Sequence, residues 1–272
     1  MNHSLLTGAL VGTLSAVALA QANPAQAFTL KINPNTSFSS NSPHTGASGD
    51  LDFTFSQVGN QVRLNLGVAN TTNLNTSDGA GATISRLVGV AFDLPSLVQS
   101  YIFEQKDNAS SPLRRLFGEQ SLTSQTVQGS AALSPFSNNP PAGYPGGNFD
   151  VGIRSGGSGG GFNGGNPTGG LAEDTATAIS FLLTTKSTAK QVEGAFYWGF
   201  NNVGGTNTYG AEPLRAALRF QAVDGDLDYD GETSDKLLAK PEAIPTPALL
   251  PALLAFGAGV FRKKKQEQAQ EA

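Results

Sequence analysis

A stretch in the first third of the chain alternates apolar and polar residues on both sides of a Gly-Asn pair. Leu51, Phe53 and Phe55 alternate with polar neighbours before this pair, and the same alternation resumes after it, from Val62 to Val68. Successive side chains of a β-strand point to opposite faces of a sheet, so a period of two buries one face. The pattern predicts a β-hairpin over residues 50–70 with one face buried in a core.

Further short apolar runs, separated by Gly, Asn, Ser and Pro, predict more strands. A helical period of 3.6 residues is not evident over any long stretch, and residues 94–105 are the one candidate for a short helix. Many short strands between polar turns are typical of an all-β fold, and we expect a β-sandwich or jelly roll with long Gly-rich loops. The expected strands are 85–95, 148–154, 175–185, 193–202 and 214–223, and the expected loops are 120–142 and 145–171.

The cysteine and histidine content limits the chemistry. The chain has no cysteine, which excludes disulfides, thiolate metal sites and cysteine nucleophiles. Its two histidines are His3, in a segment that we expect to be removed, and His44, which we expect in a loop. A multi-histidine metal centre is therefore excluded. The net charge of −4 lacks the basic excess typical of nucleic-acid-binding proteins, so nucleic acid is not an expected partner.

Residues 1–27 have the pattern of a secretory signal peptide. Residues 5–20 are uncharged and mostly apolar, and polar residues with Pro24 end the run. Ala25 and Ala27 supply the small residues that signal peptidase requires, so we expect cleavage after Ala27. No Lys or Arg precedes the apolar run, and the alternative is an uncleaved membrane anchor.

The C-terminal end has three parts in a fixed order. The motif Pro245-Thr246-Pro247-Ala248 comes first, the apolar residues 249–261 follow, and Arg262, Lys263, Lys264 and Lys265 come last. As a helix, the apolar part spans about 20 Å, which is less than the ~30 Å hydrocarbon core of a bilayer. We expect transient insertion with the basic residues on the cytoplasmic side. The alternative is an ordinary single-pass tail anchor.

This three-part end resembles the PEP-CTERM class of bacterial sorting signals, and more closely the PTPA-CTERM variant known from cyanobacteria. The resemblance implies recognition by an exosortase, an integral-membrane cysteine protease or transpeptidase, and processing near Pro245–Ala248. The expected division of the chain is a signal peptide at 1–27, a β-sandwich domain at 28–240, a Pro-rich linker with the sorting motif at 241–248, a hydrophobic segment at 249–261 and a basic cytoplasmic tail at 262–272.

One cluster of carboxylates suggests a calcium site. Asp226, Asp228 and Asp230, followed by Gly231, match the first half of a calcium-binding loop, in which carboxylates two residues apart surround one ion. No acidic residue stands where a twelve-residue loop starting at Asp226 requires its last ligand. The alternative is a solvated acidic turn. Calcium is the one cofactor that the sequence suggests.

Aromatic and acidic residues suggest two further functions. Phe196, Tyr197 and Trp198 in an expected strand are candidates for stacking on sugar rings. Asp93 and Glu193 are the candidate carboxylate pair of a glycoside hydrolase.

The expected function is that of a non-enzymatic, exported structural protein of the cell surface or extracellular matrix. The alternatives are a secreted carbohydrate-binding module, with or without calcium, and a glycoside hydrolase. The implied partners are signal peptidase, an exosortase-like protease, the inner membrane for a short time, and extracellular polysaccharide.

Overall fold

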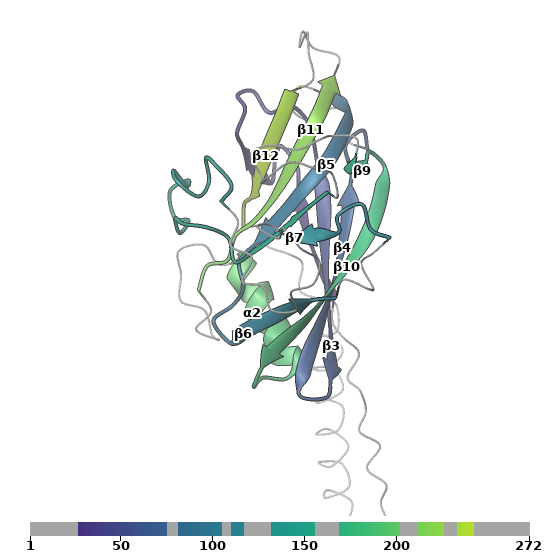
Figure 1. Ribbon diagram of the computed structural model, residues 1–272. Coiled ribbons are helices and arrows are strands. Elements are labelled where there is room, and N and C mark those ends of the chain that lie inside the picture. The colour runs from purple at the N-terminus through teal and green to yellow at the C-terminus, as the bar shows by residue number, and fades with distance from the viewer. Residues whose placement is uncertain are drawn as a thin grey trace, which may run out of the picture.

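A computed structural model describes residues 27–74, 81–104, 110–116, 132–155, 169–201, 212–225 and 233–241. In these ranges the chain is mostly β-structure, arranged as two antiparallel sheets that enclose a common core, with one helix (Figure 1). The predicted all-β sandwich is therefore confirmed.

The two sheets differ in size and in strand order. The first sheet has the order β1-β3-β4-β10-β6, and the second has the order β2-β12-β11-β5-β8-β7, with β9 paired to β5. The strands of the first sheet are β1 (Ala27–Ile32), β3 (Gly49–Val58), β4 (Gln61–Asn70), β10 (Thr175–Thr185) and β6 (Val98–Phe103). Those of the second are β2 (Ser37–Ser39), β12 (Thr233–Ala239), β11 (Ala216–Gly225), β5 (Ala82–Phe92), β8 (Val151–Arg154), β7 (Arg115–Leu116) and β9 (Leu171–Ala172).

The hairpin predicted for residues 50–70 is confirmed as β3 and β4. Val58 pairs with Gln61 across a two-residue turn, and Gly59 adopts a positive φ of 57° there. Only glycine adopts this conformation without a steric penalty, which explains its place at the first turn position. The strands predicted around β5, β8, β10 and β11 are also confirmed, whereas β1, β2 and β12 were not predicted.

The short helix predicted over residues 94–105 is wrong, because this segment contains strand β6. β6 pairs with the second half of β10, where Tyr101 lies opposite Leu183 and Phe103 lies opposite Phe181. Both aromatic side chains are buried in the core. Pairing with the edge of β10 therefore decides that Val98–Phe103 is a strand, because its local sequence favours neither a strand nor a helix strongly.

The strand predicted over residues 193–202 is also wrong, because helix α2 (Ala189–Asn201) occupies this segment. Thr188 and Gln191 form a capping box: the backbone N–H of Thr188 donates to Gln191 Oε1 at 2.9 Å, and that of Gln191 donates to Thr188 Oγ1 at 3.4 Å. The apolar residues buried on one face have the helical spacing i, i+3, i+4, i+7, i+8. They are Val192, Ala195, Phe196, Gly199 and Phe200.

The core between the sheets is rich in phenylalanine. Phe53 on β3 stacks on Phe28 at 5.0 Å between ring centroids, meets Phe92 edge to face at 5.9 Å, and contacts Phe200 of α2 at 5.2 Å. Phe196 lies 5.1 Å from Phe55. The helix therefore closes one end of the sandwich with aromatic side chains beside β3 (Figure 1).

A second, smaller core lies on the outer face of the second sheet. Leu133, Phe136 and Phe149, from the segment 132–150, pack there on Ala217 and Leu238. The structure describes residues 132–142 of the predicted loop 120–142. In this part, Leu133 and Phe136 pack against the outer face of the second sheet.

Two glycines of α2 provide a matched test of the helix and its packing. A Cβ at Gly199 would lie 3.1 Å from the carbonyl oxygen of Glu212 and closer still to the side chain of Leu214, whereas a Cβ at Gly194 meets nothing within 4 Å. Gly194→Ala is expected to stabilise the protein by up to about 1 kcal/mol, because alanine is the better helix former. Gly199→Ala is expected to destabilise it by roughly 1–3 kcal/mol through overpacking. Urea unfolding measures both, and equal effects of the two substitutions would contradict the placement of α2.

Candidate functional site

The site that the structure builds most completely lies where β5 ends and β11 begins. Asp93 directly follows the last residue of β5, and Arg215 directly precedes the first residue of β11. Phe92 and Ala216 are paired across these strands, so the next residues outward meet at the same end of the sheet. The backbone N–H of Asp93 donates to the carbonyl oxygen of Arg215 at 2.9 Å. The pairing of two strands distant in sequence thus positions the ion pair.

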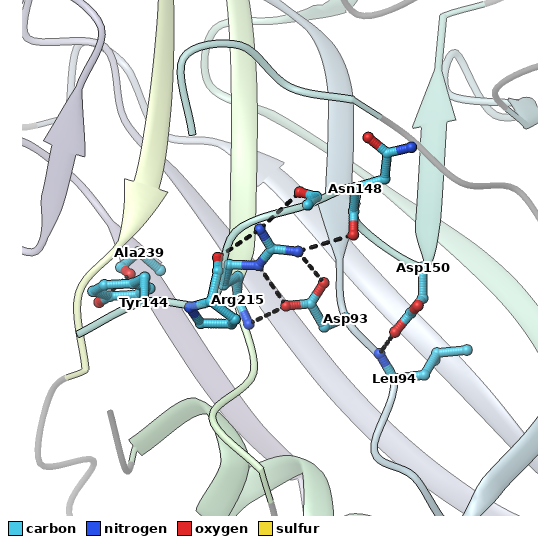
Figure 2. Close-up of polar contacts among 9 residues, drawn as sticks. Asp93, Leu94, Tyr144, Asn148, Asp150, Arg215 and Ala239 are labelled. Atoms are coloured by element: carbon cyan, nitrogen blue, oxygen red, sulfur yellow. Dashed lines mark hydrogen bonds and ion pairs between the residues drawn. The ribbon is translucent and has the colours of Figure 1, made fainter. Parts of the chain in front are cut away.

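Every guanidinium N–H of Arg215 has an acceptor (Figure 2). Nε and Nη2 donate to the two carboxylate oxygens of Asp93 at 2.8 and 3.0 Å. Nη1 donates to the carbonyl oxygens of Pro145 and Gly147, each at 3.0 Å, and Nη2 also donates to that of Asn148 at 2.9 Å. The Arg215 side chain is 3% exposed and that of Asp93 is 10% exposed. This is a buried bidentate pair that fastens the segment 145–148 to the sandwich.

Neighbouring contacts extend this clamp. The guanidinium carbon of Arg215 lies 4.3 Å from the centre of the Phe149 ring, a cation–π contact. Asp150 accepts a hydrogen bond from the backbone N–H of Leu94 at 2.8 Å. Burial raises the pKa of the Asp93 carboxyl above its ordinary value, and the hydrogen bonds and charge of Arg215 oppose this shift.

A cavity of about 380 Å³ opens beside this pair. Two exposed carboxylates, those of Asp150 and Glu212, stand at its wall with the apolar side chains of Leu94 and Leu214. The carboxylate of Asp93 is occupied by three hydrogen bonds from Arg215, one of them from its backbone N–H at 2.8 Å. In this arrangement Asp93 and Arg215 hold the wall together, and Asp150 Oδ2 accepts the hydrogen bond from the backbone N–H of Leu94.

The predicted carboxylate pair is not brought together in this cavity. Asp93 lines it, but Glu193 is not among its lining residues. Glu193 lies on α2, is 8% exposed and has an interaction partner within the chain.

The three aromatic residues predicted for carbohydrate stacking do not share one exposed face. Phe196 is fully buried in the core, Tyr197 is partly buried and meets Phe28 edge to face at 5.8 Å, and Trp198 is 38% exposed. Consecutive residues of a helix point about 100° apart, which separates them. Sugar binding by Tyr197 and Trp198 stays a prediction.

A buried carboxylate lies on β12, shortly after the three aspartates predicted to bind calcium. Asp235 on β12 is fully buried and accepts hydrogen bonds from the hydroxyls of Ser39 and Thr45, both at 2.7 Å, and of Ser40 at 3.3 Å. These contacts fasten the segment 39–45 to β12. His44 lies in this segment, and burial lowers the pKa of its imidazole.

The remaining predicted site residues fall outside the described part of the chain. Asp226, Asp228 and Asp230 lie there, as do Ala25, the motif Pro245–Ala248 and the basic run Arg262–Lys265. Ala27 is described, as the first residue of β1. In the described ranges, no three Asp, Glu or His side chains are grouped to hold a metal ion, and no helix there is long and apolar enough to cross a membrane.

The Arg215–Asp93 clamp was not predicted from the sequence. The sequence offered only a weak signal for it. Asp93 and Arg215 each stand near one end of an expected core strand, 85–95 and 214–223. Charged residues at such positions are common, and only the pairing of the strands makes these two meet. No protein-family model matches the chain, and neither the curated proteins nor the solved structures contain a match to it.

Proposed function

We propose that this chain is an exported structural protein of the cell surface or extracellular matrix, processed at both ends. Signal peptidase removes the first segment, and an exosortase-like membrane protease cuts at Pro245–Ala248. The hydrophobic segment and basic run act as a temporary membrane handle. The observation that carries the proposal is the order of these three C-terminal parts directly after a folded β-sandwich.

The positions of the two processing points relative to the strands support this proposal. Cleavage after Ala27 removes only the first residue of β1 and leaves Phe28, which is 6% exposed and stacks in the core. At the other end β12 stops at Ala239, and Lys240 is held by a 2.7 Å hydrogen bond from its N–H to the carbonyl oxygen of Thr36. Both cuts therefore fall outside the residues that build the core.

The test is the intact mass of the mature protein recovered from its source cells. We expect a chain that begins at Phe28 and lacks the segment after Pro245–Ala248. The double variant Pro245→Ala/Pro247→Ala is expected to retain the basic run, whereas Pro241→Ala, a proline change in the same linker, is expected to be processed normally.

Other outcomes would contradict the proposal. A wild-type protein that keeps residues 249–272 would favour a permanent tail anchor. Loss of processing in the Pro241→Ala control would show that linker conformation, rather than the motif, is recognised.

A further inference from the structure

Helix α2 carries a buried carboxylate, that of Glu193, which is the one acidic residue of the helix. Glutamate is rarely buried without a partner, and Glu193 has an interaction within the chain. A carboxylate has about four acceptor positions, so it can accept hydrogen bonds from a further donor. The elements packed beside this carboxylate indicate which donor that is.

Helix α2 and strand β1 run in the same direction, because both are antiparallel to β3. In β1, Phe28 lies opposite Phe53. In α2, the backbone N–H of the first residue, Ala189, donates to Oε1 of Gln57, near the hairpin end of β3, at 3.0 Å. Phe200, near the last residue of α2, contacts Phe53 in the middle of β3. Residues earlier in α2 therefore lie level with residues earlier in β1.

Two residues of α2 contact Phe28, and they define the side of the helix that faces β1. The ring of Tyr197 lies 5.8 Å and that of Phe200 lies 6.3 Å from the ring of Phe28. At about 100° per residue, Glu193 points between these two directions, about 40° from Tyr197 and about 20° from Phe200. It precedes Tyr197 by about 6 Å along the helix axis, a length that corresponds to just under two residues of a strand. Glu193 is therefore placed beside the start of β1, where Ala27 is joined to Phe28.

We propose that Glu193 binds the α-amino group of Phe28 once the chain is cut after Ala27. This inference rests on the proposed function, because the cut creates the amino group. The cut replaces a neutral peptide N–H by a group that is mostly protonated at neutral pH. An ammonium and a carboxylate form a charge-assisted hydrogen bond, which is stronger than a neutral one. The pair fastens β1 to α2 and makes the mature chain more stable than its precursor.

The two carboxylates of β3 lie on the other face of the first sheet. Asp52 accepts a hydrogen bond from the hydroxyl of Thr29, and Asp50 lies opposite Lys31. The residue between them and the residue after Asp52 are buried in the core, so both carboxylates point outward. They contact side chains of β1 from outside, whereas α2 packs on the inner face.

The test compares the full-length chain before and after a cut directly before Phe28. Residues 24–27 are replaced by the recognition sequence of a site-specific protease that leaves Phe28 as the first residue, and the protein is kept in a non-ionic detergent. Glu193→Gln is expected to lower the melting temperature of the cut chain by at least about 3 °C more than that of the uncut chain. Glutamine keeps the size of the side chain and one acceptor oxygen but removes the charge. The difference between the two forms therefore isolates the contact with the amino group.

Two further variants serve as controls. Glu212→Gln removes an exposed carboxylate beyond the other end of α2, and the melting temperature is expected to stay within about 1 °C in both forms. Asp52→Asn weakens the contact with Thr29 and is expected to lower the melting temperature equally in both forms.

An equal loss in the cut and uncut forms of Glu193→Gln, or no loss in either, would overturn the inference. A loss that depends on the cut in Asp52→Asn instead would place the amino group on the outer face, which also overturns it. If Glu193→Gln does not fold in either form, the chain with Glu193 decides, because its cut form is expected to melt at least about 3 °C higher than its uncut form and an equal or lower value contradicts the pair. Since an added protease makes the cut, a failure of cells to cut after Ala27 leaves this measurement valid, and a failure here leaves the proposed processing intact.

Discussion

Phe196→Ala is expected to lower the free energy of unfolding by about 3–5 kcal/mol, the usual cost of truncating a buried phenylalanine. Phe196 is fully buried and contacts the rings of Phe53, Phe55, Phe92 and Phe200. Its removal leaves a cavity where helix α2 meets both sheets. Urea unfolding measures the loss as a lower midpoint, with the slope against denaturant unchanged.

Trp198→Ala is the control for this prediction. Trp198 is 38% exposed, and its loss is expected to cost no more than about 1 kcal/mol. Two residues apart on a helix point about 200° from each other, so Phe196 and Trp198 lie on opposite sides. In a strand they would share one face, and the two substitutions would then cost similar amounts. Similar costs would therefore contradict the helix.

Arg215→Met is expected to destabilise the protein by about 3–5 kcal/mol, because it leaves the buried Asp93 carboxylate without its partner. It also removes the donors to the carbonyl oxygens of Pro145, Gly147 and Asn148. The matched control is Arg63→Met, which breaks the 2.8 Å ion pair with Glu104, where the arginine side chain is 36% exposed. Exposed pairs contribute about 0–1 kcal/mol, so this control is expected to change stability little.

The double variant Asp93→Leu/Arg215→Met tests whether the unpaired Asp93 carboxylate causes the loss of stability in Arg215→Met. Replacing both partners of a buried pair by apolar residues is often close to neutral, whereas breaking it is not. We therefore expect the double variant to be more stable than Arg215→Met alone, and a double-mutant cycle by urea unfolding measures the difference. A double variant as unstable as the single one would mean that the segment 145–148 depends on Arg215 itself.

Local patterns were sufficient for the elements whose conformation is decided by neighbours in sequence. The β3–β4 hairpin needs only alternating side chains and Gly59 at its turn, and β10 follows from its own apolar run. The sequence also contains signals for helix α2, namely the Thr188–Gln191 capping box and the spacing of Val192, Phe196 and Gly199, although a strand was predicted there. Its dense aromatic residues, which favour strands on average, led to the wrong prediction.

The sequence by itself determined the all-β class, the hairpin and the main core strands, because hydrophobic period and turn chemistry are local. It also defines the two proposed processing segments, 1–27 and 241–272, of which the described structure includes only Ala27 and Pro241. Only the tertiary structure decided that β6 is a strand and that Asp93 meets Arg215. These features depend on which strands become neighbours and in which register. Residues far apart in the sequence, such as Asp93 and Arg215 at a separation of 122 positions, acquire that relation only when the sandwich closes.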